Sequence, residues 1–265
     1  MFGTRSHFPM GPATESAGAS RRATACALVV AHGSPSDPDL LDETVCRLAR
    51  RIAGGAPGWR IRGATLAKRG SLEAAVSAVG RGELITVYPL FMSDGWFVSQ
   101  ELPRRLAELT DGPVSYLAPL GLDPALPELS ARRVLEIARK IGAASSECTL
   151  ILAAHGSRSS SKPAQTAARI KAEIIDAGKF ADVRLGFVDE APSIAEAAVC
   201  AAPAICLPLF ATRAGHVRFD VPAALTEAGF TGPVLAPIGD DPEVPGLIAA
   251  ALRTSRLGRP DLPAR

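Results

Sequence analysis

The sequence has few aromatic residues, no long apolar run and no excess of charge of one sign. Phe, Trp and Tyr make up 5% of the 265 residues and 47% are hydrophobic, so a core would consist mainly of Ala, Val, Leu and Ile. There is no run of about 18 apolar residues, the length that a membrane-spanning helix requires. The formal net charge of +2 gives no reason to expect nucleic-acid binding. We therefore expect partners other than membranes and nucleic acids.

Several sequence motifs of common enzyme classes are missing. The phosphate-binding pattern Gly-x-x-x-x-Gly-Lys-Ser/Thr and the dinucleotide pattern Gly-x-Gly-x-x-Gly do not occur, so an ATP- or NAD-dependent reaction has no support. Gly-x-Ser-x-Gly is also missing. Ser34 and Ser157, which follow His-Gly, are therefore better explained as residues that cap a loop or a helix than as nucleophiles.

The cysteines indicate a reducing compartment. Their number is odd, no Cys-x-x-Cys pair is present, and three of them lie in or beside apolar runs. We expect buried or partly buried thiols in a cytoplasmic protein. The first 23 residues agree with this, because they lack the continuous apolar segment of a signal peptide. The cysteines are Cys26, Cys46, Cys148, Cys200 and Cys206.

The chain contains an internal duplication. Four segments of the first half return in the second half in the same order, at nearly constant offsets of 119 to 123 residues. The clearest pair is CALVVAHGS, which returns as TLILAAHGS. A repeat at a fixed period indicates two copies of one structural unit. The paired segments are 26–34 with 149–157, 65–76 with 187–199, 85–91 with 204–210, and 112–124 with 232–242.

Each copy reads as short apolar strands that alternate with segments of helical periodicity. This alternation predicts an α/β fold with a parallel sheet covered by helices on both faces. We expect two tandem flavodoxin-like domains, each with a parallel four-stranded sheet, at 24–142 and 147–255. Flexible tails are expected at 1–23 and 256–265.

A divalent-metal site is predicted in the second half. His155, Glu190 and His216 each follow one of its first three predicted strands. In an open parallel sheet, ligands bind beyond the carboxyl ends of the strands, and a strand order of 2-1-3-4 would bring these three loops together. Two imidazoles and a carboxylate suit Co²⁺, Fe²⁺, Ni²⁺ or Zn²⁺. Three protein ligands also leave coordination positions open, as a catalytic site requires.

The first half lacks two of these three ligands. His32 matches His155, but Phe97 stands in the position of His216 and Lys68 in that of Glu190. Neither a phenyl ring nor an ammonium group can bind a cation in their place. We expect this half to have lost its metal site, which leaves His32 either as a proton-transfer or substrate-binding group or as a structural residue.

Basic side chains are expected around the predicted site. In a nearly neutral protein, their gathering at strand-end loops hints at a small polyanionic substrate such as a polycarboxylate. Arg213 and Arg218 are the residues that we predict to bind this substrate. The other basic residues in these loops are Arg158, Lys162, Lys68, Arg69, Arg104 and Arg105.

The AHGS segments and the segment PLF followed by AGHVRFDVP resemble the CbiX/SirB family of sirohydrochlorin chelatases, which are ATP-independent class II enzymes. The resemblance covers about 26–250 and matches the long form of the family, in which two copies are fused. It implies a chelatase-like fold with a cleft between the halves. The family's metal-binding histidines would correspond to His155 and His216, and its acidic residue to Glu190.

The resemblance implies a lyase that inserts Co²⁺ or Fe²⁺ into sirohydrochlorin or a related tetrapyrrole, in sirohaem or cobalamin biosynthesis. Ni²⁺ is a further candidate, and no cofactor beyond the metal substrate is expected. Insertion removes two pyrrole protons, which His155 or Glu190 could accept; Glu190 could equally be a ligand. A monomer is expected, because the two halves can supply both sides of the cleft. The alternative is a non-catalytic metallochaperone or tetrapyrrole carrier.

Overall fold

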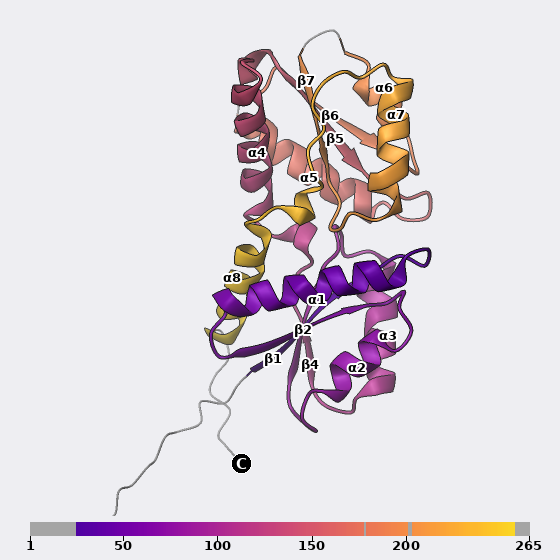
Figure 1. Cartoon of the computed structure of the whole chain (residues 1–265), viewed down its shortest axis with the longest axis vertical. Helices are drawn as coiled ribbons and strands as arrows, with labels where there is room; N and C mark the ends of the chain where they lie inside the picture. Colours follow the sequence, from indigo (N-terminus) through magenta and orange to yellow (C-terminus); the bar gives the residue numbers. More distant parts are fainter. Residues whose placement is uncertain (1–24, 178, 201–202, 258–265) are drawn as a thin grey trace, which may run out of the picture.

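The computed structural model describes residues 25–177, 179–200 and 203–257, and it contains two parallel sheets that are each covered by helices (Figure 1). The predicted tail 1–23 lies outside the described residues. The tail predicted at 256–265 does so too, except for its first two residues, which belong to the last helix. The two sheets correspond to the two sequence repeats, which confirms the predicted α/β duplication.

The first sheet has four strands in the order β2-β1-β3-β4, so the strand that precedes His32 lies at its centre. All three pairings are parallel, as predicted. The elements of this half are β1 (Ala25–Ala31), α1 (Pro38–Gly55), β2 (Trp59–Thr65), α2 (Ser71–Ser77), β3 (Ile85–Pro89), the π-helix η1 (Phe97–Glu101), α3 (Leu102–Leu109), β4 (Val114–Tyr116), η2 (Leu120–Leu122) and α4 (Leu126–Lys140).

The second sheet has the same order but one strand fewer, β6-β5-β7, so the prediction of four strands is wrong for this half. A single bridge between Cys206 and Val234 takes the place of the fourth strand. The reason is local: residues 234–236 separate Pro233 from Pro237, whereas residues 114–118 separate the corresponding prolines of the first half. Prolines donate no ladder hydrogen bond, so the shorter segment cannot extend the pairing.

The elements of the second half follow a short 3-10 turn, η3 (Ser145–Glu147). They are β5 (Thr149–Ala154), α5 (Lys162–Asp176), β6 (Asp182–Phe187), α6 (Ile194–Ala198), β7 (Ala204–Pro208), the π-helix η4 (His216–Asp220), α7 (Val221–Glu227), η5 (Ile238–Asp240) and α8 (Val244–Leu257).

The central strands β1 and β5 are buried on both faces, which explains why they consist almost entirely of apolar residues. Along β1, Ala27 and Val29 belong to one apolar cluster, whereas Leu28 and Val30 belong to another. Successive strand residues point to opposite faces, so each face receives its own helices. On the first sheet, α2 and α3 form one layer and α1 forms part of the other.

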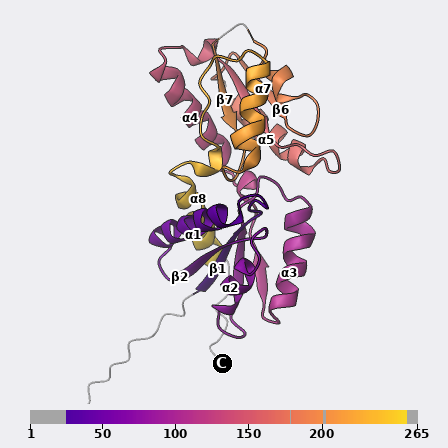
Figure 2. The same cartoon turned by 45° about the vertical axis from the view of Figure 1, so that its right-hand side comes forward.

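The last helix of each repeat packs on the other half. Helix α8, from the second repeat, lies beside α1 on the first sheet, and α4, from the first repeat, packs on α5 and β7 of the second sheet. Figures 1 and 2 both show α8 against α1 and α4 beside the second sheet. The predicted boundaries at 24–142 and 147–255 follow the sequence repeat, and the two helices are exchanged across them. One apolar cluster consequently includes residues of both halves.

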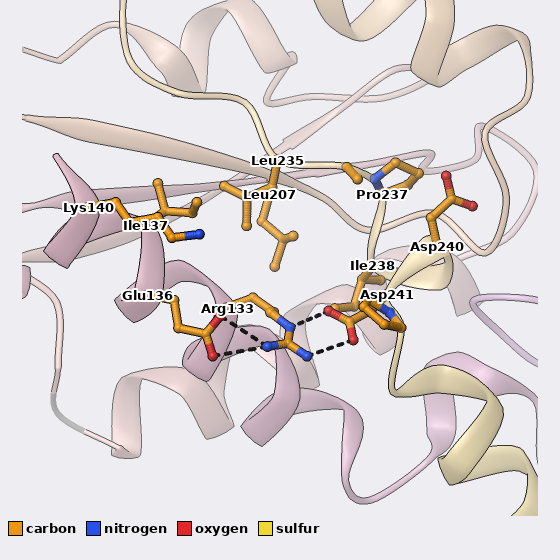
Figure 3. A pocket seen from close by; sticks show the side chains of 12 residues that line it. Arg133, Glu136, Ile137, Lys140, Leu207, Leu235, Pro237, Ile238, Asp240 and Asp241 are labelled. Atoms are coloured by element: carbon orange, nitrogen blue, oxygen red, sulfur yellow. Dashed lines mark hydrogen bonds and ion pairs between the residues drawn. The ribbon is translucent and has the colours of Figure 1, made fainter. Parts of the chain in front are cut away.

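Two arginines of α4 pair with the segment that leads into α8. Arg133 donates to Asp241 at 2.5 and 3.1 Å, and Arg132 donates to Glu243 at 2.6 and 2.9 Å. Figure 3 shows Arg133 at the edge of a cavity of about 290 Å³, between Glu136 on its own helix and Asp241 of the second repeat. Paired bidentate contacts of this kind fix orientation as well as distance.

The cysteines are all unpaired, as predicted: Cys26, Cys148 and Cys206 are buried, and Cys46 and Cys200 are partly buried. Among the described helices, none has both the length and the apolar composition needed to cross a bilayer.

Candidate metal centre

His32 and His155 occupy equivalent turns at the carboxyl ends of the central strands β1 and β5. The glycine after each histidine has a positive φ, 80° at Gly33 and 71° at Gly156. Side chains larger than hydrogen are strained in that conformation. A Cβ atom on Gly156 would also lie 2.7 Å from Oε1 of Glu190. The His-Gly-Ser turn therefore needs its glycine to place the imidazole beyond the strand end.

His155 and His216 lie side by side in the second half. Their ring centroids are 4.4 Å apart and the rings are inclined by 78°. His216 is the first residue of η4, which follows β7, the neighbour of β5 in the sheet. The side chains are 45% and 40% exposed, so an ion can reach both from solvent. The structure thus brings together the two imidazoles that the sequence places at adjacent strand ends.

The Nδ1 atoms of both imidazoles are held by acceptors. Nδ1 of His155 lies 3.0 Å from the carbonyl oxygen of Gly156 and 3.3 Å from Oδ2 of Asp189. Nδ1 of His216 lies 2.6 Å from Oδ2 of Asp220. A carbonyl oxygen only accepts, so Nδ1 of His155 is the protonated nitrogen, and Asp220 favours the same tautomer of His216. In both rings Nε2 is left as the unprotonated nitrogen that can bind an ion.

Glu190 follows β6 as predicted, but its side chain holds the loop. Oε1 accepts the backbone N–H of Ser157 at 2.9 Å, next to the His-Gly-Ser turn. Within residues 25–177, 179–200 and 203–257, no three His, Cys, Asp or Glu side chains are grouped closely enough to hold a metal ion. The predicted set of His155, His216 and Glu190 is therefore present as an imidazole pair with a carboxylate in the adjoining loop.

The first half reproduces this geometry with a phenyl ring in place of one imidazole. The centroids of His32 and Phe97 are 4.4 Å apart, with the rings inclined by 77°. Phe91 lies 6.4 Å from Phe97 at 23°, as Phe210 lies 6.4 Å from His216 at 26°. Phe97 thus occupies the place that His216 has in the second half, without a donor atom.

Lys68, in the position of Glu190, belongs to a network of polar groups in the first half. Its Nζ lies 3.1 Å from carboxylate oxygens of both Asp39 and Asp42. Burial raises the pKa of the Asp42 carboxyl, but hydrogen bonds from Ser71 and Lys68 outweigh burial and leave this pKa below its ordinary value. The positive charge of Lys68 is thus balanced by the carboxylates of Asp39 and Asp42, and these carboxylates are already paired with Lys68.

Two ion pairs join the strand-end loops of the two halves. Nη1 of Arg218 lies 3.6 Å from Oδ2 of Asp37, and Nζ of Lys162 lies 2.8 Å from Oδ2 of Asp94. The predicted substrate-binding residue Arg218 is therefore close to the loops of the first half. Arg213 instead pairs with Asp240 of its own half at 3.1 Å.

Arg104 and Arg105, which the sequence places among the basic residues of the site, both donate to the buried carboxylate of Glu101. Their hydrogen bonds lower the pKa of Glu101 to about 2. Both arginines are thus hydrogen-bonded to a carboxylate of their own half.

Several residues near the imidazoles were missed at the level of the sequence. Asp220 lies four residues after His216, a spacing that brings two side chains together on a helix, and Asp189 directly precedes Glu190. These spacings could have identified them. The π-helices at Phe97 and His216 have no such signature, although π-helices often occur at functional sites. Trp96, directly before Phe97, and Phe219, in η4, are exposed aromatic residues.

Comparisons with known proteins match the fold and the two repeats of this chain. The CbiX family model matches residues 26–137 and again 149–255, once for each repeat. Comparison with curated proteins gives no significant match. A solved structure of CbiX, described as the terminal enzyme for biosynthesis of siroheme in denitrifying bacteria, is similar with a TM-score of 0.79 and 44% identity. That match covers 86% of this chain and 98% of the other.

Two further structures share the fold at lower identity. SirB from Bacillus subtilis with Fe³⁺ matches with a TM-score of 0.70 and 16% identity, over 88% of this chain and 95% of that one. A multi-domain protein of Deinococcus radiodurans with structural similarity to chelatases matches with a TM-score of 0.64 and 22% identity, over 86% of this chain and 54% of that one. The fold is therefore chelatase-like, and with both repeats matched by one family model, the chain belongs to the CbiX family.

Proposed function

We propose that this protein is a metal chelatase that inserts a divalent ion, Co²⁺ or Fe²⁺, into sirohydrochlorin or a related tetrapyrrole. The observation that carries the proposal is the pair His155 and His216, with ring centroids 4.4 Å apart at the carboxyl ends of adjacent strands. Membership of the CbiX family supports the same reaction, and the similar enzyme of denitrifying bacteria supports a role in sirohaem biosynthesis. Cobalamin biosynthesis is the other pathway that would use this reaction, and Ni²⁺ is a further candidate metal.

The two imidazoles bind the incoming ion through Nε2, because their Nδ1 atoms are occupied by Gly156 and Asp220. A two-imidazole site leaves most coordination positions to water. Weak and open coordination suits an ion that is to be handed on, since a closed set of four protein ligands would retain it. Positioning the ion against the ring and replacing its water molecules lowers the barrier to insertion.

Two pyrrole N–H protons must leave the macrocycle when the metal enters. His155 is the first candidate acceptor: once the ion has passed to the ring, its freed Nε2 can take a proton, with Asp189 3.3 Å from Nδ1 to stabilise the imidazolium. Glu190 is the second, as a base or as an added ligand. Either role requires its carboxylate to leave the N–H of Ser157 or to use its other oxygen.

The substrate's carboxylates would be bound by Arg213 and Arg218, with His32 facing the ring from the first half. Both guanidinium groups are about half exposed; Arg213 lies in the loop after β7 and Arg218 in η4, two residues after His216. We propose a monomer, because the ion pairs Arg218–Asp37 and Lys162–Asp94 already join the two sides of the site within one chain. The five unpaired thiols favour the cytoplasm, and the reaction needs no cofactor beyond its metal substrate.

The test is metal insertion by the purified protein. Metal-free sirohydrochlorin is incubated with Co²⁺, Fe²⁺ and Ni²⁺ in parallel, with and without protein, and insertion is followed by the absorbance of the macrocycle. We expect the protein to accelerate insertion of at least one ion over the spontaneous rate, and His216→Ala to remove that acceleration. A protein that binds the macrocycle and the ions but leaves every rate unchanged would be a carrier, and the proposal would fail.

A further inference from the structure

The first half has aromatic rings in the positions where the second half has its metal-binding loop. Trp96 and Phe97 correspond in sequence to Gly215 and His216. The ring centroids of Trp96 and Phe97 are 5.1 Å apart, and Phe97 lies 4.4 Å from His32. Three rings therefore form one continuous surface, which we call the aromatic surface: His32, Trp96 and Phe97.

This aromatic surface is open to solvent. Trp96 is 58% exposed and Phe97 is 37% exposed, although both are large apolar side chains. Phe97 has a partly buried neighbour, Phe91, whose ring lies 6.4 Å away and is inclined by 23°. Large apolar groups that are contiguous, exposed and held in place commonly mark a binding site.

The charges around the aromatic surface indicate which ligand it would take. Asp94, two residues before Trp96, pairs with Lys162 of the second half. The aromatic surface is therefore close to a place where an ion pair connects the two halves. Lys162 and Arg218 provide cations within these loops, and their present partners, Asp94 and Asp37, are carboxylates. A flat aromatic ring with carboxylates at its edge matches both properties: the ring can stack, and the carboxylates can take the places of Asp94 and Asp37.

We propose that Trp96 and Phe97 are binding residues for the flat face of the tetrapyrrole, so that the first half holds the macrocycle while the second half holds the metal. This inference rests on the proposed function for the identity of the ligand. It explains why the geometry around Phe97 is kept although the metal ligand is gone: the ring has the position of His216 but offers a π surface. Among the ring contacts of the described residues, those of Trp96 and Phe97 are with each other, His32 and Phe91, and not with His155 or His216.

The experiment separates binding of the macrocycle from binding of the metal. Metal-free sirohydrochlorin is titrated into wild type, Trp96→Ala, Phe97→Ala and Trp96→Phe, and Co²⁺ alone is titrated into the same proteins. Aromatic contacts contribute about 0.5–1.5 kcal/mol each, so each Ala variant should bind the macrocycle roughly two- to tenfold more weakly. Trp96→Phe should recover most of the loss, and the Co²⁺ affinity should be unchanged throughout.

The matched control is Ile141→Ala, which shortens another exposed apolar side chain. Ile141 is 48% exposed and lies beside Pro203 and Ala204. These residues are at the amino end of β7, whereas the imidazole pair is at the carboxyl ends of the strands. This variant should bind both ligands like wild type. In turnover, Trp96→Ala should raise KM with little change in kcat.

Wild-type macrocycle affinity in both Trp96→Ala and Phe97→Ala would overturn the inference, and so would an equal loss of macrocycle and Co²⁺ binding. Failure of the proposed function has a different signature. If the wild-type protein binds the macrocycle without accelerating insertion, the proposed chelatase activity is refuted. The macrocycle titrations of the variants would still decide whether Trp96 and Phe97 bind the macrocycle.

Discussion

The Nδ1 atom of His216 lies 2.6 Å from Oδ2 of Asp220, four residues later on the same π-helix. This contact fixes the orientation of the imidazole and directs the protonated nitrogen away from the ion. Carboxylates behind a histidine ligand typically contribute a factor of about 10 to 100 in metal affinity. Asp220 is therefore a positioning residue of the proposed centre.

Asp220→Asn should weaken Co²⁺ binding by about tenfold or more, because an amide holds the histidine less strongly and does not favour one tautomer. Calorimetric titration with Co²⁺ measures the effect. Asp182→Asn is the matched control. Asp182 pairs with Arg184 and is the first residue of β6, so it lies at the end of the strand away from the imidazole pair. Unchanged Co²⁺ affinity in Asp220→Asn would show that this carboxylate does not position His216.

The arginines at the strand ends give a second prediction. Arg213→Ala and Arg218→Ala should each weaken binding of the metal-free macrocycle by about two- to fivefold, the range for ion pairs exposed to solvent, and leave Co²⁺ affinity unchanged. The loss should be smaller at high salt, because salt screens exposed charges. Arg47→Ala, which removes an exposed guanidinium paired with Glu43 along α1, is the control. Equal losses for metal and macrocycle would contradict a carboxylate-binding role.

Acid stability gives a third prediction through Glu101, which is only 7% exposed and accepts hydrogen bonds from Arg104 and Arg105. These bonds lower its pKa from 4.5 to about 2. A carboxyl group with a lowered pKa in the folded state stabilises that state above its unfolded pKa, and the contribution is lost as the pH falls. Glu101→Gln should therefore have a lower Tm than wild type at pH 7.

The difference in Tm between Glu101→Gln and wild type should shrink as the pH falls from about 4.5 to about 2, the interval between the two pKa values. Thermal melts followed by circular dichroism at several pH values measure it. Glu108→Gln is the control, since Glu108 also pairs with Arg104 but is exposed. A constant difference across this interval would mean that Glu101 stabilises the fold by packing and not by its charge.

The duplication and the parallel sheets could be predicted because they depend on patterns within each repeat. Short apolar strands between amphipathic helices permit few arrangements. The strand order then places His155 and His216 at adjacent strand ends, and the structure brings their rings within 4.4 Å. Periodicity could not predict the exchange of α4 and α8, because an apolar helix face fits either sheet. The choice depends on contacts such as Arg133–Asp241, which are distant in sequence.

The side chain of Glu190 illustrates a second limit of the sequence. Its position after β6 was predicted, but whether its oxygen faces an ion or a backbone N–H depends on rotamers and on the tight turn at Gly156. The shortened fourth strand of the second half has a simpler cause. Its two prolines are closer together than those of the first half, and this could have been read from the sequence.

The difference between the two halves gives the last prediction. The second half offers two imidazoles, each with an acceptor on Nδ1, whereas the first half offers His32 with Phe97 beside it. His155→Ala and His216→Ala should each abolish chelation and lower Co²⁺ affinity by about tenfold or more. His32→Ala should leave that affinity nearly intact and slow insertion at most partly.

Phe97→His tests whether a second imidazole at the place of Phe97 is enough to restore a metal site. The new ring would lie beside His32, but the supporting carboxylates would be missing. Ala67 stands in the position of Asp189, and Glu101, in the position of Asp220, is engaged by Arg104 and Arg105. Lys68 replaces Glu190 and offers no ligand atom, because its ammonium group is paired with Asp39 and Asp42. We therefore expect Phe97→His to bind Co²⁺ with the stoichiometry of wild type. If calorimetry instead finds an additional site of similar affinity, or if His32→Ala abolishes metal binding while His216→Ala does not, the assignment of the metal centre to the second half is wrong.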